Sequence, residues 1–159
     1  MQDTTNTLDP RGWPAPETFL TYQLTRVVQE LNAQGTAYVR RYSDLSLVQW
    51  RILLMVQRFG KSNPRDITAA TGMDKGLFSR NLKGLISRKL ITARKDPKDR
   101  RRIDLVVTPT GRALYDKIIP LMEQRQAHVL HGLTQGEVAQ FQRMLDIVSR
   151  NAAFRAPTG

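Results

Sequence analysis

The sequence predicts a mainly α-helical chain with one small β-hairpin near its middle, an α+β fold. Hydrophobic residues recur every three or four positions along most of the chain, which is typical of helices packed on one side. Residues 91–107 instead read as two short strands separated by DPKDRRR, whose proline and aspartates are typical of turns. Side chains that cap helices stand directly before most of the apolar segments.

The composition indicates a partner that is a polyanion. The 159 residues carry a net charge of +11 and a pI near 10.7. No apolar run approaches a membrane-spanning length and no signal peptide opens the chain, so we expect a cytoplasmic protein. With no cysteine, the chain has no disulfide, thiolate metal site or cysteine-based redox sensing.

The N-terminal part predicts an arm followed by a long helix. Residues 1–16 are polar and rich in proline, with Trp13 as the one anchor-like side chain. We expect Trp13 to pack on a helix of this chain or of a partner chain, and ligand stacking is the less favoured alternative. A helix is predicted from Glu17 to about Tyr38, and Ser46 is expected to cap the next helix, 47–59.

Two further helices joined by a tight turn follow. Asn63 is expected to cap a helix that ends near Thr71, Gly72 supplies the turn, and Asp74 caps a helix to about Lys89. The apolar face of the last helix comprises Leu77 or Phe78, Leu82, Leu85 and Ile86. Its other face or margins carry Lys75, Ser79, Arg80 and Lys83.

The hairpin that follows has a basic tip, with strands expected at 91–95 and 103–107. From Asp74 to Arg102 the chain has eleven Lys and Arg residues and only three Asp residues, whereas an ordinary solvated face mixes the signs. Two helices and a basic hairpin form a winged helix-turn-helix. Its second helix fits a DNA major groove, and its wing reaches the backbone or the minor groove.

The C-terminal part predicts two more helices. Thr108 is expected to start the first, which contains Pro120 and ends at Gly132. Thr134 and Glu137 have the spacing of a capping box for the last helix. Its apolar residues recur at three and four positions, a seam suited to a partner helix: Val138, Phe141, Leu145, Val148 and Ala152. Since the recognition domain does not need the terminal helices, we expect them to dimerise.

The expected parts are a flexible arm, a dimerisation helix, a winged helix-turn-helix DNA-binding domain, C-terminal dimerisation helices and a frayed tail. They cover, in that order, residues 1–16, 17–44, 45–110, 111–153 and 154–159.

With these residues laid out, the chain resembles the MarR family of winged-helix transcriptional regulators. The resemblance rests on SRNLKGLISRKLITARKDPKDRR at 79–101, VVTPTG at 106–111 and GLTQGE at 132–137. Val107 stands where leucine is usual in the family. The resemblance covers roughly residues 45–148. It implies a homodimer with interlocked terminal helices and two winged lobes on a pseudo-palindromic operator. It also implies a repressor released by a small phenolic or anionic ligand.

The candidate DNA contacts follow from charge, from hydrogen-bonding chemistry and from the resemblance. On the recognition helix they are Lys75, Phe78, Ser79, Arg80 and Lys83. Asn81 is either a base reader or part of the core margin. Thr68 and Thr71 are candidates for phosphate contacts. The wing candidates are Lys98, Arg100, Arg101 and Arg102.

Neighbouring wing residues point to opposite faces, so we expect either Arg100 or Arg102 to enter the minor groove. The resemblance implies that Arg101 pairs with Asp99 or Asp96 and braces the wing. Possible lining residues of an effector pocket are Tyr22, Tyr38, Tyr42, Trp50 and Arg51, most of which also fit a packing role.

Other functional classes fit less well. An enzyme would need a site, and the chain has no cysteine nucleophile, glycine-rich phosphate loop or acidic cluster. His128 and His131 could share a metal ion, but a third ligand is lacking apart from Glu123 and Glu137. We therefore predict no catalysis, cofactor or metal. An architectural DNA-binding protein with little sequence preference remains the alternative. RNA binding is disfavoured because the aromatic residues lie on helical stripes.

Overall fold

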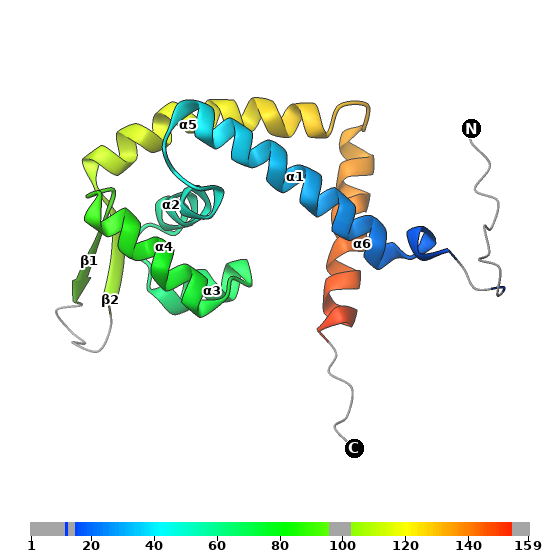
Figure 1. The fold of residues 1–159 in the computed structure, drawn as a ribbon, viewed down its shortest axis with the longest axis horizontal. Helices are drawn as coiled ribbons and strands as arrows, with labels where there is room; N and C mark the ends of the chain where they lie inside the picture. The colour runs from blue at the N-terminus through cyan, green and yellow to red at the C-terminus, as the bar shows by residue number, and fades with distance from the viewer. Residues whose placement is uncertain (1–11, 13–14, 96–102, 154–159) are drawn as a thin grey trace, which may run out of the picture. The chain divides into compact units, whose positions relative to one another are not determined.

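The computed structural model describes residue 12, residues 15–95 and residues 103–153 (Figure 1). The described residues are mainly helical, with one antiparallel two-stranded sheet, which confirms the predicted fold class. The elements in chain order are η1 (Pro16–Thr18), α1 (Leu20–Tyr42), α2 (Leu47–Phe59), α3 (Pro64–Thr71), α4 (Lys75–Ser87), β1 (Ile91–Lys95), β2 (Ile103–Val107), α5 (Pro109–Val129) and α6 (Gln135–Ala152).

The chain divides into two compact units, Met1–Pro120 and Leu121–Gly159. The division falls inside α5, which continues through Pro120. Proline has no N–H group, so one hydrogen bond of the helix is missing at this point.

The core of the first unit is built around α2, which packs against α1, α3, α4 and β2. Four of its side chains are buried: Trp50, Ile52, Leu53 and Val56. Side chains from the surrounding elements complete this core: Val39, Ile67, Phe78, Leu85, Ile91, Leu105 and Ile118.

Capping side chains fix most of the helix starts. Ser46 Oγ accepts a hydrogen bond from the Gln49 N–H at 3.1 Å, and Gln49 Oε1 accepts one from the Ser46 N–H at 3.0 Å. The side chains of Asn63 and Asp74 accept hydrogen bonds from backbone N–H groups at the starts of α3 and α4. The predicted bounds of α2, α3 and both strands are confirmed, because local side-chain chemistry sets them.

The predicted bounds of α1 and α4 are wrong by a few residues. Phe19 has an extended backbone (ψ 132°), so residues 16–18 form a separate turn and α1 begins at Leu20. At its other end, α1 continues past Tyr38 until Ser43 becomes extended. α4 ends at Ser87 because the chain turns at Lys89, whose φ is +56°.

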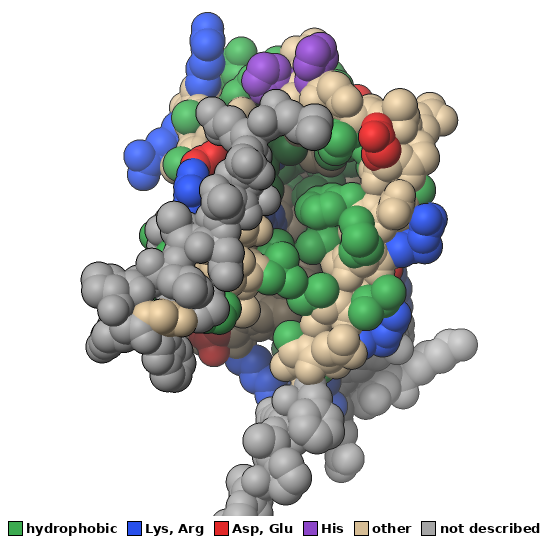
Figure 2. Space-filling view, turned by 90° about the vertical axis from the view of Figure 1, so that its right-hand side faces the viewer, with side chains coloured by type: hydrophobic (Ala, Val, Ile, Leu, Met, Phe, Trp, Pro, Cys, Tyr) green, Lys and Arg blue, Asp and Glu red, His purple; other side chains and the backbone are tan. Residues whose placement is uncertain are grey.

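The second unit contains the end of α5 and α6, joined through Gly132 with φ +88°. Thr134 and Glu137 form the predicted capping box at the start of α6. No residue of α6 is buried, and four of its large apolar side chains are exposed: Phe141, Met144, Leu145 and Ile147. Figure 2 shows hydrophobic side chains lying open on the face that it presents. Among the described residues, no helix combines the length and apolar character needed to cross a membrane.

Candidate nucleic-acid interface

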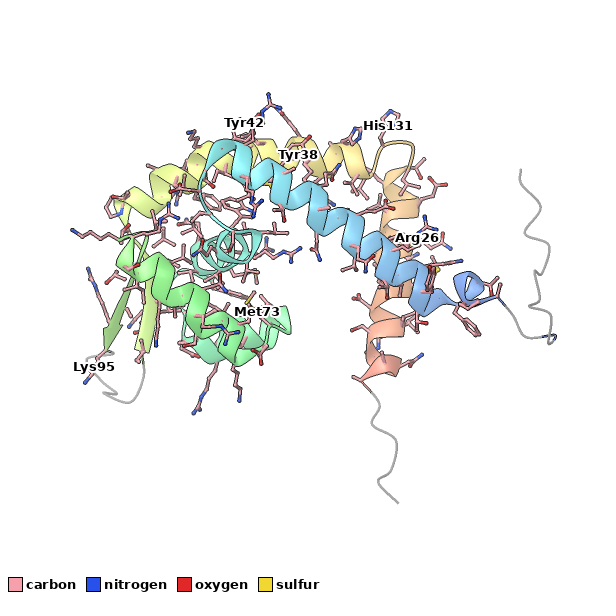
Figure 3. All side chains as sticks on the ribbon, in the orientation of Figure 1. Arg26, Tyr38, Tyr42, Met73, Lys95 and His131 are labelled. Carbon is pink, nitrogen blue, oxygen red and sulfur yellow. The ribbon has the colours of Figure 1, made fainter. Side chains whose placement is uncertain are left out.

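The turn between α3 and α4 is fixed by backbone conformation and by a threonine. Gly72 is left-handed (φ +63°, ψ 15°), a conformation that glycine adopts without steric cost. The Thr71 hydroxyl donates to the Ile67 carbonyl at 2.8 Å and accepts from the Met73 N–H at 3.3 Å. Figure 3 shows Met73 in this turn. The angle at which α4 leaves α3 is therefore set by local chemistry.

α4 has one buried face and one basic face, as predicted. Phe78 and Leu85 are buried. The candidate contacts Lys75, Ser79, Arg80 and Lys83 are exposed. Ile86, which was predicted on the apolar face, is 36% exposed as well. None of the ion pairs among the described residues involves these three cations. Three uncompensated positive charges and a hydroxyl thus lie on one side of a helix whose other side is held in the core.

Phe78 requires a correction. It was expected among the DNA contacts, but only 3% of it is exposed. One helical residue turns by about 100°, so Phe78 points into the core while Ser79 points outward. Phe78 therefore stabilises the position of α4 rather than contacting a base.

An open cleft of about 850 Å³ lies between α3 and α4 and includes several of the candidate residues. It is lined by Pro64, Arg65, Thr68, Ala69, Gly72, Met73, Lys75, Phe78, Ser79 and Leu82. The Thr68 hydroxyl donates to the carbonyls of Pro64 and Arg65, both at 3.0 Å. Phosphate oxygens only accept hydrogen bonds, so Thr68 or Thr71 would have to release a helix carbonyl to bind one.

Asn81 lies at the core margin, the second of its two expected positions. Its Nδ2 donates to the Leu77 carbonyl at 2.8 Å, and its Oδ1 accepts from the Ser46 hydroxyl at 3.3 Å. Both ends of the amide are engaged within the protein. Asn81 therefore joins α4 to the start of α2.

Two further features hold α4 against α2 and the segment before it. α4 and α2 approach closely at Gly84, because a Cβ atom added there would lie 2.8 Å from Gln49 Nε2. Arg88 Nη2 lies 2.9 Å from Asp44 Oδ1. A backbone hydrogen bond at Asp44 and the Arg88 guanidinium lower the pKa of the Asp44 carboxyl. The pair is exposed to solvent, so it fixes geometry more than it adds stability.

The C-terminal end of α4 leads into the wing through a Schellman motif. The Leu90 N–H donates to the Leu85 carbonyl and the Lys89 N–H to the Ile86 carbonyl, both at 2.9 Å. Thr108, the residue directly after β2, connects the end of that strand to this turn, because its hydroxyl donates to the Lys89 carbonyl at 2.6 Å.

The wing is an antiparallel hairpin in which Ile91 lies opposite Val107 and Lys95 opposite Ile103. Exposed Arg94 and Lys95 lead from β1 toward the tip, and Figure 3 shows Lys95 at the end of that strand. Residues 96–102 lie outside the described residues, and with them the predicted roles of Asp96, Lys98, Asp99, Arg100, Arg101 and Arg102. Trp13 also lies outside them.

Sequence reasoning missed how β2 of the wing is held. The carboxylate of Asp104 in β2 is 1% exposed, and its Oδ2 lies 2.8 Å from Lys61 Nζ. Next to it, Ser62 and Leu105 exchange two backbone hydrogen bonds of 3.4 and 2.7 Å. An aspartate inside the otherwise apolar strand IDLVV was the available signal.

The five candidates for an effector pocket occupy different environments. Trp50 is 1% exposed and stacks on Tyr115 with ring centroids 5.7 Å apart, so it is a core residue. Arg51 Nη2 donates to Asn32 Oδ1 at 2.7 Å. Tyr22 lines a small cleft at the start of α1.

The remaining two pocket candidates, Tyr38 and Tyr42, lie toward the end of α1, where the Arg41 guanidinium lies 5.7 Å from the centroid of the Tyr42 ring (Figure 3). The cleft that Tyr22 lines includes none of the other four pocket candidates. A second cleft includes none of the five candidates, and its lining residues are Arg40, Ser43, Asp44, Leu45, Ser46 and Gln49.

Within the described ranges, no three His, Cys, Asp or Glu side chains come close enough to bind a metal ion together. His128 and His131 are connected by a backbone hydrogen bond of 3.2 Å from the His131 N–H to the His128 carbonyl.

Comparison with known proteins agrees with this geometry. Residues 43–102 match the model of the MarR family, a segment that includes α2, α3, α4 and β1. The transcriptional repressor NicR of Pseudomonas putida is 26% identical over 121 residues, which cover 74% of this chain and 77% of NicR.

Solved structures share the fold. BpsR of Bordetella bronchiseptica, whose DNA binding is regulated by 6-hydroxynicotinic acid, superposes with a TM-score of 0.76 at 27% identity, covering 85% of this chain and 96% of BpsR. A complex of Staphylococcus aureus MepR with DNA superposes with a TM-score of 0.76 at 19% identity, covering 87% and 99%. At that identity it shows the fold alone. In its matched segment, its relatives and its fold, the chain is similar to the MarR family of winged helix-turn-helix transcriptional regulators.

Proposed function

We propose that the protein is a ligand-responsive repressor that binds a pseudo-palindromic operator as a homodimer. The observation that carries the proposal is the exposed basic face of α4, which has no compensating acids among the described residues and is backed by a buried core. A helix presented in this way fits the DNA major groove.

Within this proposal, the exposed residues of α4 divide the work of recognition. Arg80 suits a guanine through its two-pronged guanidinium, while Lys75 and Lys83 suit phosphates or bases, and Ser79 can bond to either. On the wing, Arg100 or Arg102 enters the minor groove, and Lys98 adds a backbone contact. Arg101 braces the wing by pairing with Asp99 or Asp96.

Homodimerisation is supported by the exposed apolar side chains of α6. Phe141 is 46% exposed and Leu145 is 37% exposed, although both lie on the predicted seam. In proteins most of the stability of a helix comes from packing of its amphipathic face, so α6 needs an apolar partner. A second copy of the chain is the partner we propose, because two lobes would read two half-sites together.

The proposed effector is a small aromatic acid. The support comes from the relatives: NicR is a repressor, and BpsR responds to 6-hydroxynicotinic acid. Of the candidate residues, Tyr38, Tyr42 and Arg51 remain as lining groups, while Trp50 would act as a buried wall.

The test is a titration of the purified protein against the intergenic DNA upstream of its own gene, with excess random duplex present. We expect saturation at one dimer per palindrome that survives competition, and release by 6-hydroxynicotinic acid but not by nicotinamide, its neutral relative. A complex that random duplex removes equally well would support the architectural alternative. No duplex binding at physiological salt would refute DNA regulation altogether.

Two variants connect the titration to α4. Arg80→Ala and Lys83→Ala should each weaken binding, and a lost phosphate contact should reduce the slope of log K against log salt by about 0.9. Lys117→Ala is the matched control, because Lys117 is also an exposed cation but lies on α5. If the control weakens binding as much as the α4 variants, charge alone explains the affinity and the assignment of α4 is wrong.

A further inference from the structure

A buried carboxylate lies in β2 of the wing. Asp104, the second residue of β2, is 1% exposed, and Lys61 in the segment between α2 and α3 places its ammonium 2.8 Å from the carboxylate. Removing a charged carboxylate from water costs several kcal/mol unless a partner compensates it. Lys61 supplies such a partner for Asp104.

The same segment holds β2 through its backbone. Ser62 is buried and exchanges two hydrogen bonds with Leu105, the residue that follows Asp104. α3 begins at Pro64, two residues after Ser62. The ion pair and the backbone bridge therefore connect β2 of the wing directly to the start of the helix-turn-helix.

The position of the pair along the chain links it to the wing tip. Asp104 is two residues beyond Arg102, the last of the basic tip residues. In the hairpin, Asp104 lies opposite Arg94, next to the last described pair of Lys95 with Ile103. The ion pair therefore holds β2 close to the point where the chain leaves the basic tip residues.

We propose that Lys61 and Asp104 are positioning residues whose ion pair sets the placement of the wing relative to α4, and thereby the DNA affinity of the protein. This inference rests on the proposed function. Because Asp104 is negatively charged, removing its charge should strengthen DNA binding if only net charge matters. The same change should weaken DNA binding if Asp104 positions the wing.

The test is Asp104→Asn, which keeps the size of the side chain and removes one negative charge. If only net charge matters, the variant binds DNA more tightly, because the protein becomes more positive. If Asp104 positions the wing, the variant binds about tenfold more weakly, as expected for the loss of one good contact, and its salt slope falls by about one. Tighter or unchanged binding would overturn the proposal.

Asp116→Asn is the matched control. Asp116 is an exposed aspartate on α5 that pairs with Arg112 at 2.9 Å, so the change in charge is the same but the wing is not involved. We expect unchanged or slightly tighter binding. On the other side of the pair, Lys61→Met should weaken binding and Lys61→Arg should largely restore it. Equal binding by Lys61→Met and Lys61→Arg would refute a role for the pair.

Hydrogen exchange of the DNA-free protein separates this inference from the proposed function. The amides of residues 103–107 should exchange faster in Asp104→Asn than in the wild type, while those of α2 stay protected. Unchanged exchange in β2 would count against the positioning role even if the variant bound DNA poorly. Failure of the wild type to bind any duplex would refute the proposed function instead, and this exchange measurement would still test the pair.

Discussion

Gly111→Ala should destabilise the protein strongly, because the start of α5 lies against the turn that ends α4. A Cβ atom at position 111 would lie 2.0 Å from the Leu90 carbonyl oxygen and 2.9 Å from Val107 Cγ1. Real Cβ atoms do not approach other atoms closer than 3.0 Å, so the two backbone segments would have to separate. That movement would strain the hydrogen bond of 3.1 Å from the Thr108 N–H to the Leu90 carbonyl.

The expected magnitude follows from overpacking against a rigid backbone. Overpacking costs about 1–3 kcal/mol, and the upper end applies here because the obstructing atom is a carbonyl oxygen and not a flexible side chain. A gain of up to about 1 kcal/mol from the better helix propensity of alanine opposes it. We expect a net loss of about 2 kcal/mol, which lowers Tm by about 4–8 °C for a protein of this size.

The measurement is thermal unfolding followed by circular dichroism at one fixed protein concentration, since a dimer has a concentration-dependent Tm. Gly136→Ala is the matched control, because Gly136 also lies in the first turn of a helix and its added Cβ would meet nothing closer than 3.9 Å. We expect that control to leave Tm unchanged or raise it. A Gly111→Ala protein as stable as the wild type would show that the close approach is not a constraint.

Two other predictions concern helix ends. Lys89→Gly should raise the free energy of unfolding in urea by about 0.5–1 kcal/mol, because glycine adopts the observed φ of +56° without strain; an unchanged or lower stability would contradict this. Hydrogen bonds from the N–H and hydroxyl of Thr134 lower the pKa of Glu137 from its ordinary 4.5. A lowered pKa stabilises the fold above 4.5 and loses this effect as the pH falls through the folded value. Glu137→Gln should therefore be less stable than the wild type at neutral pH and equally stable in acid, and a constant difference across a pH series of denaturation curves would refute it.

Features governed by neighbouring residues were predictable from the sequence. The bounds of α2, α3, β1 and β2 follow from caps, a turn glycine and strand alternation, all of which act within a few residues. The division of α4 into a basic and an apolar face also followed from its period. Phe78 did not, because it and Leu77 both border the apolar face, and packing against the rest of the core decides between them.

Features that depend on distant residues were not predictable. Asn81 accepts its hydrogen bond from Ser46, and the ring of Trp50 stacks on Tyr115, pairs that are separated by 35 and 65 residues. The spacing of apolar residues in a helix predicts whether Trp50 faces the core or the solvent. It does not predict which distant residue the Trp50 ring contacts. For the same reason, the candidates for an effector pocket were chosen by their positions in the chain, and the structure places Trp50 in the core.

The contacts around α4 reduce the conformational entropy that this helix would lose on binding DNA. Its first turn is capped by Asp74, its middle is joined to Ser46 through Asn81, and its end is tethered to Asp44 by Arg88. A recognition helix held at three points in the absence of DNA loses little conformational freedom on binding, so more of each contact appears as affinity. By contrast, α6 buries no residue of its own. Because the core of the first unit comes from its own elements, we infer that loss of the proposed dimer would leave the winged lobe folded. Loss of the dimer would then weaken DNA binding because each lobe would bind its half-site independently. The surface of each lobe that contacts DNA would stay intact.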